Sequence, residues 1–153
     1  MEELRVTGEN TTQFIVIKLG DEQYGININH IDNIVRMQHI TRVPEVASYL
    51  KGVINLRGEV IPVMSLRIKM GMPEDILTKS TRIIILKMDQ QGTIGIIVDE
   101  VREVVTLDNS QIEKVSYDPK DERVRANFIS GIGKCEGGLI SLLDLNLVVP
   151  ENA

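Results

Sequence analysis

The side chains that could carry acid–base, metal or nucleophilic chemistry in this chain are few and scattered. The two histidines, His30 and His39, have no cysteine or further histidine at the spacing of a metal site. Cys135 is the single cysteine, and because no base accompanies it we expect a thiol packed among apolar residues. We expect His30 to be a solvated side chain. The sequence therefore predicts no metal site.

Two longer patterns resemble catalytic motifs and fail on their details. The stretch GIGKCEGG, residues 131–138, lacks the glycine-to-lysine spacing and the following helix of a phosphate-binding loop, and it fits a β-hairpin instead. A pair of carboxylates sharing a proton, as in the aspartic proteases, needs an Asp-Ser/Thr-Gly tripeptide, which the chain lacks. Asp144 follows an apolar run, but its counterpart earlier in the chain is Ser65. We expect a protein that is not an enzyme and binds no cofactor.

One arginine stands out by its surroundings. Arg57 interrupts the apolar stretch GVINLRGEVIPVMSL, residues 52–66, directly before Gly58. Such an arginine is commonly a solvated turn residue. Alternatively, its planar guanidinium, which pairs bidentately and is enriched in binding hot spots, anchors a protein partner. The matching position later in the chain is Glu136, so any such role belongs to the first half alone.

Composition bounds the remaining classes of function. The 153 residues carry a formal net charge of −5, and aromatic residues make up 3% of them. An oligonucleotide-binding barrel would show basic residues interleaved with surface aromatics, so we expect no nucleic-acid partner. The amino terminus lacks the apolar segment of a signal peptide, and no apolar run is long enough to cross a bilayer. With a single cysteine, these features predict a cytoplasmic protein without membrane insertion.

The elements that must position these residues come from an internal repeat. YGININHIDNIV, residues 24–35, matches IGIIVDEVREVV, residues 94–105, at an offset of 70 residues. GVINLRGEVIPVMSL matches GIGKCEGGLISLLDL, residues 131–145, at an offset of 79 residues. Glycine and apolar positions persist while polar ones change, as expected of a duplicated unit with constrained buried positions. We place the nine additional residues of the second copy in an exposed loop within residues 116–127.

Each copy predicts four or five short antiparallel strands. Residues 20–22 and Gly58 mark hairpin turns, and β-branched residues supply most of the apolar positions. We expect an all-β protein with short helices, built from two small barrels that pack together and share a core. The smaller features expected are a helical turn after Pro44, a connector at residues 70–81 and a short helix near the carboxy terminus.

The repeat also sets the expected domain boundaries. The first barrel subdomain is predicted at residues 12–80 and the second at residues 81–150. The first strand and the carboxy-terminal segment are candidates for exchange between the barrels. Residues 1–11 and 151–153 are expected to be flexible termini.

At these motifs the sequence resembles the CheW-type coupling proteins of bacterial chemotaxis. The resemblance covers about residues 12–149 and rests on YGININHIDNIV, ITRVP, LKGVINLRGEVIPVMSLR, IGIIVDEV, FISGIG and LISLLDL. It implies two intertwined SH3-like barrels of five strands each. It also implies a non-catalytic adaptor that joins the cytoplasmic tips of methyl-accepting chemoreceptors to the regulatory domain of the CheA histidine kinase, in membrane-associated receptor arrays. The alternative is a regulatory interaction module of another two-component pathway.

The resemblance further implies where the partners bind. A receptor tip would insert into a groove between the barrels, at Ile15, Ile28, Ile31, Asn33, Arg57 and Val98. The kinase would bind the first barrel at Ile40, Arg42 and Gly58. Family members often carry glutamate at the position of Asn33, so a charged contact there is not implied for this chain. Asp32 would point to the opposite face of a strand.

The residue pattern by itself gives the apolar positions another interpretation. Ile28, Ile31 and Ile34, with their equivalents Val98, Val101 and Val104, exceed what one small barrel needs to fill its interior. The simplest expectation is that they form the core between the barrels. Some of them could instead line a groove that accepts apolar residues of a partner.

Overall fold

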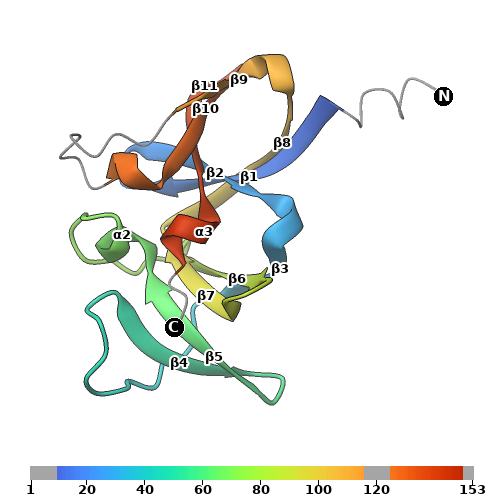
Figure 1. The fold of residues 1–153 in the computed structure, drawn as a ribbon. Helices are drawn as coiled ribbons and strands as arrows, with labels where there is room; N and C mark the ends of the chain where they lie inside the picture. The colour runs from blue at the N-terminus through green and yellow to red at the C-terminus, as the bar shows by residue number, and fades with distance from the viewer. Residues whose placement is uncertain (1–9, 116–124, 150–153) are drawn as a thin grey trace.

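The computed structural model describes residues 10–115 and 125–149 and shows two curled sheets stacked one above the other (Figure 1). Sheet A has six strands in the order β8-β1-β2-β11-β10-β9, and sheet B has five in the order β3-β6-β7-β5-β4. The predicted mainly β fold is confirmed. The strands are β1 (Thr11–Leu19), β2 (Glu22–Asn27), β3 (Ile31–Arg36), β4 (Leu50–Leu56), β5 (Glu59–Ser65), β6 (Arg82–Met88), β7 (Gly92–Val98), β8 (Glu100–Asp108), β9 (Ile112–Lys114), β10 (Ile129–Cys135) and β11 (Gly138–Leu143).

Short helices connect several of these strands. They are η1 (Ile28–His30), α2 (Leu66–Lys69), η2 (Asn109–Gln111), η3 (Arg125–Phe128) and α3 (Leu145–Val148). The expected carboxy-terminal helix is α3, whereas α2 was not predicted. After Pro44 the chain first bends, with Glu45 at a positive φ of 59°, and then makes one hydrogen-bonded turn at residues 48–49, where the Leu50 N–H donates to the Ala47 carbonyl at 3.0 Å. The helical turn expected there is thus a single turn and not a helix. Most of the expected loop at residues 116–127 lies outside the described residues. No helix among the described residues is long and apolar enough to span a membrane.

The two sheets exchange their first hairpins. β1 and β2 of the first half join sheet A, where β1 pairs with β8 and β2 runs parallel to β11. In the same way, β6 and β7 of the second half join sheet B, where β6 pairs with β3 and β7 runs parallel to β5. The subdomain division near residue 80 stays a prediction, since each sheet draws strands from both sides of it. The chain therefore crosses between sheets at η1, after β2, and at Asp99, between β7 and β8.

Sheet A has six strands where five were expected, because the short helix η2 divides one stretch of extended chain into the two strands β8 and β9. β8 and β9 are separated only by η2, yet they occupy opposite edges of the sheet. A sheet whose two edges are joined by three residues must curl until those edges meet. Sheet B closes similarly, because Thr41, shortly after β3, pairs with Val53 of the opposite edge strand β4. We call the two curled sheets barrel A and barrel B.

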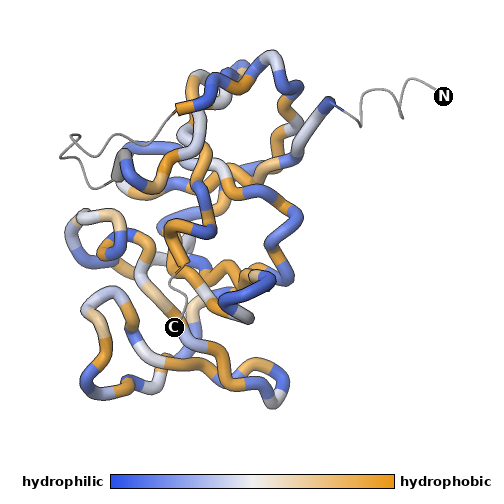
Figure 2. The backbone as a smooth tube through the Cα atoms, in the orientation of Figure 1, coloured by the Kyte–Doolittle hydropathy of each residue, from blue (hydrophilic) through white to orange (hydrophobic). Residues whose placement is uncertain are grey.

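Apolar side chains alternate between the barrel interiors and a central core. Figure 2 shows that apolar residues are distributed along the strands of both sheets. On β1, Phe14 and Val16 fill barrel A, while Ile15 and Ile17 face the central core. β6 follows the same rule, with Ile83 and Ile85 inside barrel B and Ile84 and Leu86 in the central core. The central core between the two barrels is therefore shared by both halves, as the sequence predicted.

The repeat is reproduced in three dimensions at the level of single residues. An added Cβ at Gly25 would lie 2.8 Å from Leu142 Cδ2, and one at Gly95 would lie 2.8 Å from Ile83 Cγ2. Both glycines therefore leave room for an apolar side chain inside a barrel. Ser65 and Asp144, also repeat equivalents, cap α2 and α3 by accepting backbone N–H bonds.

Candidate docking surfaces

The described residues contain no group of three or more histidine, cysteine or acidic side chains that could hold a metal ion. His39 is exposed and His30 is half-buried. Cys135 is half-buried beside the barrel A core, and burial, together with the charge of Glu103, raises the pKa of its thiol. A raised pKa disfavours the nucleophilic thiolate. The candidate site is therefore a set of surfaces.

Arg57 sits at the tip of the β4–β5 hairpin in an unusual backbone conformation. Arg57 and Gly58 have φ angles of 53° and 84°, as a two-residue type I′ turn requires. The Asn55 Oδ1 atom accepts a hydrogen bond from the Gly58 N–H at 3.1 Å. A side chain with a Cβ is disfavoured in the left-handed region, and such strain often marks functional positions. The Arg57 side chain is exposed and has no ion-pair partner among the described residues.

The equivalent tip of the β10–β11 hairpin is built differently. Its turn is Glu136–Gly137, and only Gly138, at φ 119°, has a positive φ there. The equivalents of Arg57 and Gly58 therefore lack a positive φ, and in the second half it falls on a glycine one residue after the turn. The hairpins resemble each other in one surface feature, because Val60 and Leu139 occupy equivalent positions and both are exposed.

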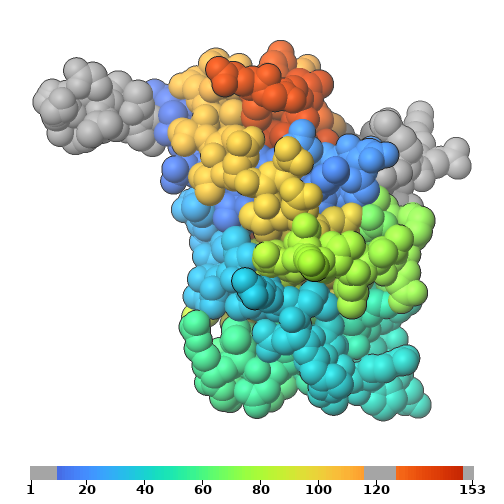
Figure 3. Space-filling view, turned by 180° about the vertical axis from the view of Figure 1, so that it is seen from behind, coloured from blue at the N-terminus to red at the C-terminus, as the bar shows by residue number. Residues whose placement is uncertain are grey.

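A second feature is an apolar surface on both sides of the junction between the barrels. It is formed by residues that we call the seam surface: Ile28, Ile31, Ile34, Val101 and Val104. All except Val104 are partly buried against the central core. Val104 pairs with Ile15 across β1 and β8 and so shares its face of the sheet, but it is 51% exposed. Figure 3 shows the surfaces of β8 and of η1 with β3 on one face of the molecule.

The residues predicted to bind a receptor divide between the core and the surface. Val98 is completely buried and Ile15 nearly so, which means that both support the seam surface from inside the central core. Ile28 and Ile31 are partly exposed on it. The pattern-based expectation of a shared core is thus correct for Val98, whereas Val104, the equivalent of Ile34, is exposed.

A β-bulge moves Asn33 away from the seam surface. Ile31 pairs with Leu86, in the central core, whereas Asn33 pairs with Ile85, in the interior of barrel B. Paired residues share a face of the sheet, so Ile31 and Asn33 face opposite sides although they are two residues apart. Asn33 Oδ1 accepts a bond from the Ile34 N–H at 2.9 Å.

The bulge also orients Asp32, and the second half repeats it. The exposed Asp32 carboxylate lies 3.5 Å from Lys87 Nζ. In the other barrel, Ile17 pairs with Val101 and Val16 with Glu103, which leaves Arg102 as the additional residue. The bulge is therefore a property of the duplicated unit.

The residues predicted to bind the kinase occupy two places. Ile40 and Arg42 line a pocket of about 490 Å³ whose walls are the loop after β3 and the connector after α2. Its apolar lining comprises Met37, Ile40, Val43, Val46, Leu50, Leu77 and Ile97. Gly58 lies at the hairpin tip beside Arg57, and Figures 1 and 3 place this tip and the pocket loop on opposite sides of sheet B.

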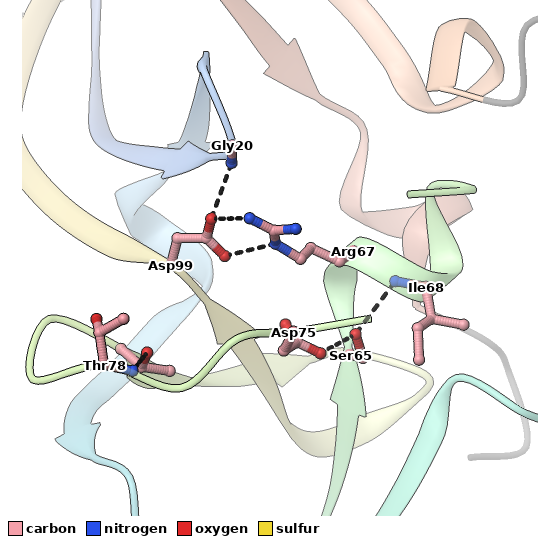
Figure 4. Close-up of polar contacts among 8 residues, drawn as sticks. Gly20, Ser65, Arg67, Ile68, Asp75, Thr78 and Asp99 are labelled. Carbon is pink, nitrogen blue, oxygen red and sulfur yellow. Dashed lines mark hydrogen bonds and ion pairs between the residues drawn. The ribbon is translucent and has the colours of Figure 1, made fainter. Parts of the chain in front are cut away.

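A polar junction that sequence reasoning missed lies between the sheets (Figure 4). Arg67 of α2 donates from Nε to Asp99 Oδ1 at 2.8 Å and from Nη2 to Asp99 Oδ2 at 2.5 Å. The Gly20 N–H, in the β1–β2 turn, donates to Asp99 Oδ2 at 2.8 Å. Burial alone would raise the pKa of Asp99, but the Arg67 and Gly20 hydrogen bonds and the arginine charge outweigh it, and the pKa is lowered. Arg67 ends the motif LKGVINLRGEVIPVMSLR and Asp99 lies within IGIIVDEV, which was the available signal.

A second carboxylate lies close to this junction. Asp75 Oδ2 accepts a hydrogen bond of 2.5 Å from the Ser65 hydroxyl, while its buried Oδ1 has no partner among the described residues. Burial raises the pKa of Asp75 in spite of the Ser65 bond and the charge of Arg67. Ser65 Oγ also accepts from the Ile68 N–H at 3.1 Å, so one hydroxyl caps α2 and holds the connector.

Comparison with known proteins identifies the family. The model of the CheW-like domain matches residues 13–152. The chain is 38% identical to the chemotaxis protein CheW of Bacillus subtilis (strain 168) over 148 residues, which cover 96% of this chain and 90% of that protein. It is 34% identical to the chemotaxis protein CheW of Helicobacter pylori over 144 residues, which cover 94% of this chain and 85% of the relative.

A solved structure agrees with the sequence matches. The scaffolding protein TtCheW from Thermoanaerobacter tengcongensis is 33% identical and superposes with a TM-score of 0.79, over 90% of this chain and 91% of the other. The exchanged hairpins, the repeated bulges and the NLRG turn described above thus occur in a chain that belongs to the CheW-like family.

Proposed function

We propose that this protein is a non-catalytic adaptor that couples the cytoplasmic tips of chemoreceptors to the CheA histidine kinase. Family membership is the observation that carries the proposal, since the matched relatives are chemotaxis proteins and the solved neighbour is described as a scaffolding protein. Two separate candidate surfaces, with no metal-binding cluster among the described residues, support an adaptor. Docking to receptors would recruit the protein from the cytoplasm to membrane-associated arrays.

The receptor is proposed to bind the seam surface, with Arg57 as a polar anchor. The seam offers partly exposed apolar side chains supported by a rigid core, which suits the apolar face of a helical partner. In both Figure 1 and Figure 3 the β4–β5 tip lies on the same side of the molecule as β3. The fork of an exposed, unpaired arginine can bind a carboxylate of the partner bidentately.

The kinase regulatory domain is proposed to bind barrel B at the pocket beside Ile40 and Arg42. Apolar side chains and the exposed Arg42 both line this pocket. Since the pocket loop lies opposite the hairpin tip, both partners can be bound at the same time. Individually modest affinities are sufficient, because an array raises the effective concentration of each partner.

Amide mapping tests the bridging role. The ¹⁵N-labelled protein is titrated with a CheA regulatory domain and, separately, with a receptor-tip fragment. We expect the kinase domain to shift amides around residues 40–50 and the receptor fragment to shift those of η1, β3 and β8. Overlapping footprints on one face would refute the bridging model.

Arg57→Ala tests the anchor separately. The variant should weaken receptor binding while leaving folding and kinase binding intact, because the Arg57 side chain is exposed and does not belong to the core of barrel B. Glu136→Ala, at the equivalent tip of the second half, is the matched control and should bind like the parent. Undiminished receptor binding by Arg57→Ala would remove Arg57 from the site.

A further inference from the structure

The two crossings between the sheets are repeat equivalents, but among the described residues only the second is held by an ion pair. Asp99 lies at the second crossing, and its equivalent at the first crossing, 70 residues earlier, is Asn29 of η1. Arg67 on α2 corresponds, at the offset of 79, to Asn146 on α3. Both charges of the pair are thus replaced by amides at the first crossing.

The ion pair connects three elements that come from both sheets. Asp99 follows β7 of sheet B and precedes β8 of sheet A, Arg67 belongs to the helix after β5 of sheet B, and Gly20 turns between β1 and β2 of sheet A. The Arg67 and Asp99 side chains are only 13% and 22% exposed. A bidentate pair with this geometry fixes orientation as well as distance.

The first crossing has only local polar contacts. The Asn29 N–H donates to Asn27 Oδ1, and the Asn146 N–H donates to Asp144 Oδ1. Both asparagines are exposed, and no bond between them is present in this part of the described chain. The first crossing, which leads directly into Ile28 and Ile31, therefore lacks the tie between sheets that the second possesses.

We propose that Arg67 and Asp99 are positioning residues whose ion pair, which we call the latch, fixes the second crossing between the sheets. The latch holds Val101 and Val104 of β8 in a fixed position on the seam surface. The first crossing, at η1, has no such ion pair among the described residues and adapts to the docked partner. This inference deepens the proposed function and rests on it for the partner, a receptor helix with an apolar face. The positional effect is direct, because Asp99 is two residues from Val101 and β8 begins at the next residue. The pair itself need not touch the partner.

Asp99→Asn tests the latch in the full-length chain, since it keeps the shape of the side chain and removes the charge that holds the arginine fork. Hydrogen exchange of the Gly20 amide should accelerate about tenfold, because its acceptor is no longer fixed. Affinity for a receptor-tip fragment should fall about tenfold, while affinity for the CheA regulatory domain stays within about twofold, because neither Arg67 nor Asp99 lines the pocket. A merely destabilised protein would lose both interactions alike.

Two further variants keep the test decisive. Glu74→Gln breaks the Lys51–Glu74 ion pair, which lies at the surface and is 72% exposed on the acid side; it should change neither Gly20 exchange nor receptor affinity. Arg67→Lys keeps the charge without the fork and should give an intermediate loss, and it replaces Asp99→Asn if that variant does not fold.

Receptor affinity of the latch variants within about twofold of the parent would overturn the positioning role. Failure of the parent to bind the receptor fragment would instead refute the proposed function, while unchanged Gly20 exchange in Asp99→Asn would reject the latch itself.

Discussion

The two halves of the molecule share their buried architecture and differ on their surfaces. Gly25 and Gly95 make room inside the barrels, and the same bulge interrupts β3 and β8. In contrast, the Arg57 tip in the first half corresponds to a Glu136 tip in the second. Packing thus preserves what the duplicated fold needs, whereas exposed positions are free to diverge. A duplicated fold can in this way carry different docking surfaces on equivalent elements.

The largest expected difference between the halves is in how much stability is lost when either of two equivalent glycines, Gly52 and Gly131, is replaced by alanine. A Cβ at Gly52, at φ 141°, would lie 2.1 Å from the Thr41 carbonyl oxygen, whereas one at Gly131 would lie 3.0 Å from that of Glu113. We expect Gly52→Ala to lower the free energy of unfolding by more than about 3 kcal/mol, and Gly131→Ala by about 1 kcal/mol. Urea unfolding measures both. Equal losses would show that the two halves tolerate side chains alike.

The next effect concerns the ion pair that only one crossing possesses. Arg67→Ala leaves the partly buried Asp99 carboxylate with the Gly20 N–H alone, and we expect a loss of about 2 kcal/mol in unfolding free energy. Because the pKa of Asp99 is lowered in the folded state, this contribution is present above the usual carboxyl pKa and disappears as the pH falls through the lowered value. Lys51→Ala, at the exposed pair, should show no measurable loss.

A smaller effect concerns the pH dependence of stability, to which Asp75 should contribute through its position beside the cap of α2. In the first half, Asp75 bonds the capping Ser65 hydroxyl, while in the second half Asp144 is itself the cap. Since burial raises the pKa of Asp75, the folded state binds its proton more tightly than the unfolded chain does. The unfolding free energy should therefore fall as the pH rises through that pKa, and Asp75→Asn should abolish this part of the fall.

The measurement for Asp75 is unfolding between acidic and neutral pH. We expect Asp75→Asn to be more stable than the parent by up to about 1 kcal/mol at neutral pH and equal to it at low pH. Asp89→Asn, in the exposed β6–β7 turn, serves as the control. A pH-independent difference would mean that the Ser65 hydrogen bond, and not burial of charge, governs this carboxylate.

The smallest effect tests the strain at the hairpin tip. Arg57→Gly places the permissive residue at φ 53°, and we expect a gain of up to about 1 kcal/mol in unfolding free energy. Glu136→Gly should give no gain, because Glu136 does not have a positive φ. A gain that accompanies lost receptor binding would indicate that the strained arginine is kept for docking. Destabilisation by Arg57→Gly would contradict the strain assigned to this turn.

Local patterns in the sequence were sufficient for the β class, the hairpins and the repeat. The turns at residues 20–22 and Gly58, the carboxy-terminal helix and the shared central core all follow from glycine positions and from period-two alternation of apolar residues. The quoted motifs also pointed to the family. The bridge from Thr41 to Val53 of β4, which closes barrel B, was not predicted, because it joins residues twelve positions apart in the chain.

The sequence by itself determined the apolar periodicity of the strands and the positions of the tight turns, since both depend on neighbours along the chain. Only the tertiary structure decided that the first hairpins change sheets, that a bulge turns Asn33 away from Ile31, and that Arg67 meets Asp99. The physical reason is that strand partners and ion pairs are chosen among segments far apart in the chain, where packing of the central core sets the register. Periodicity gives the face of a strand, but it does not give the strand beside it.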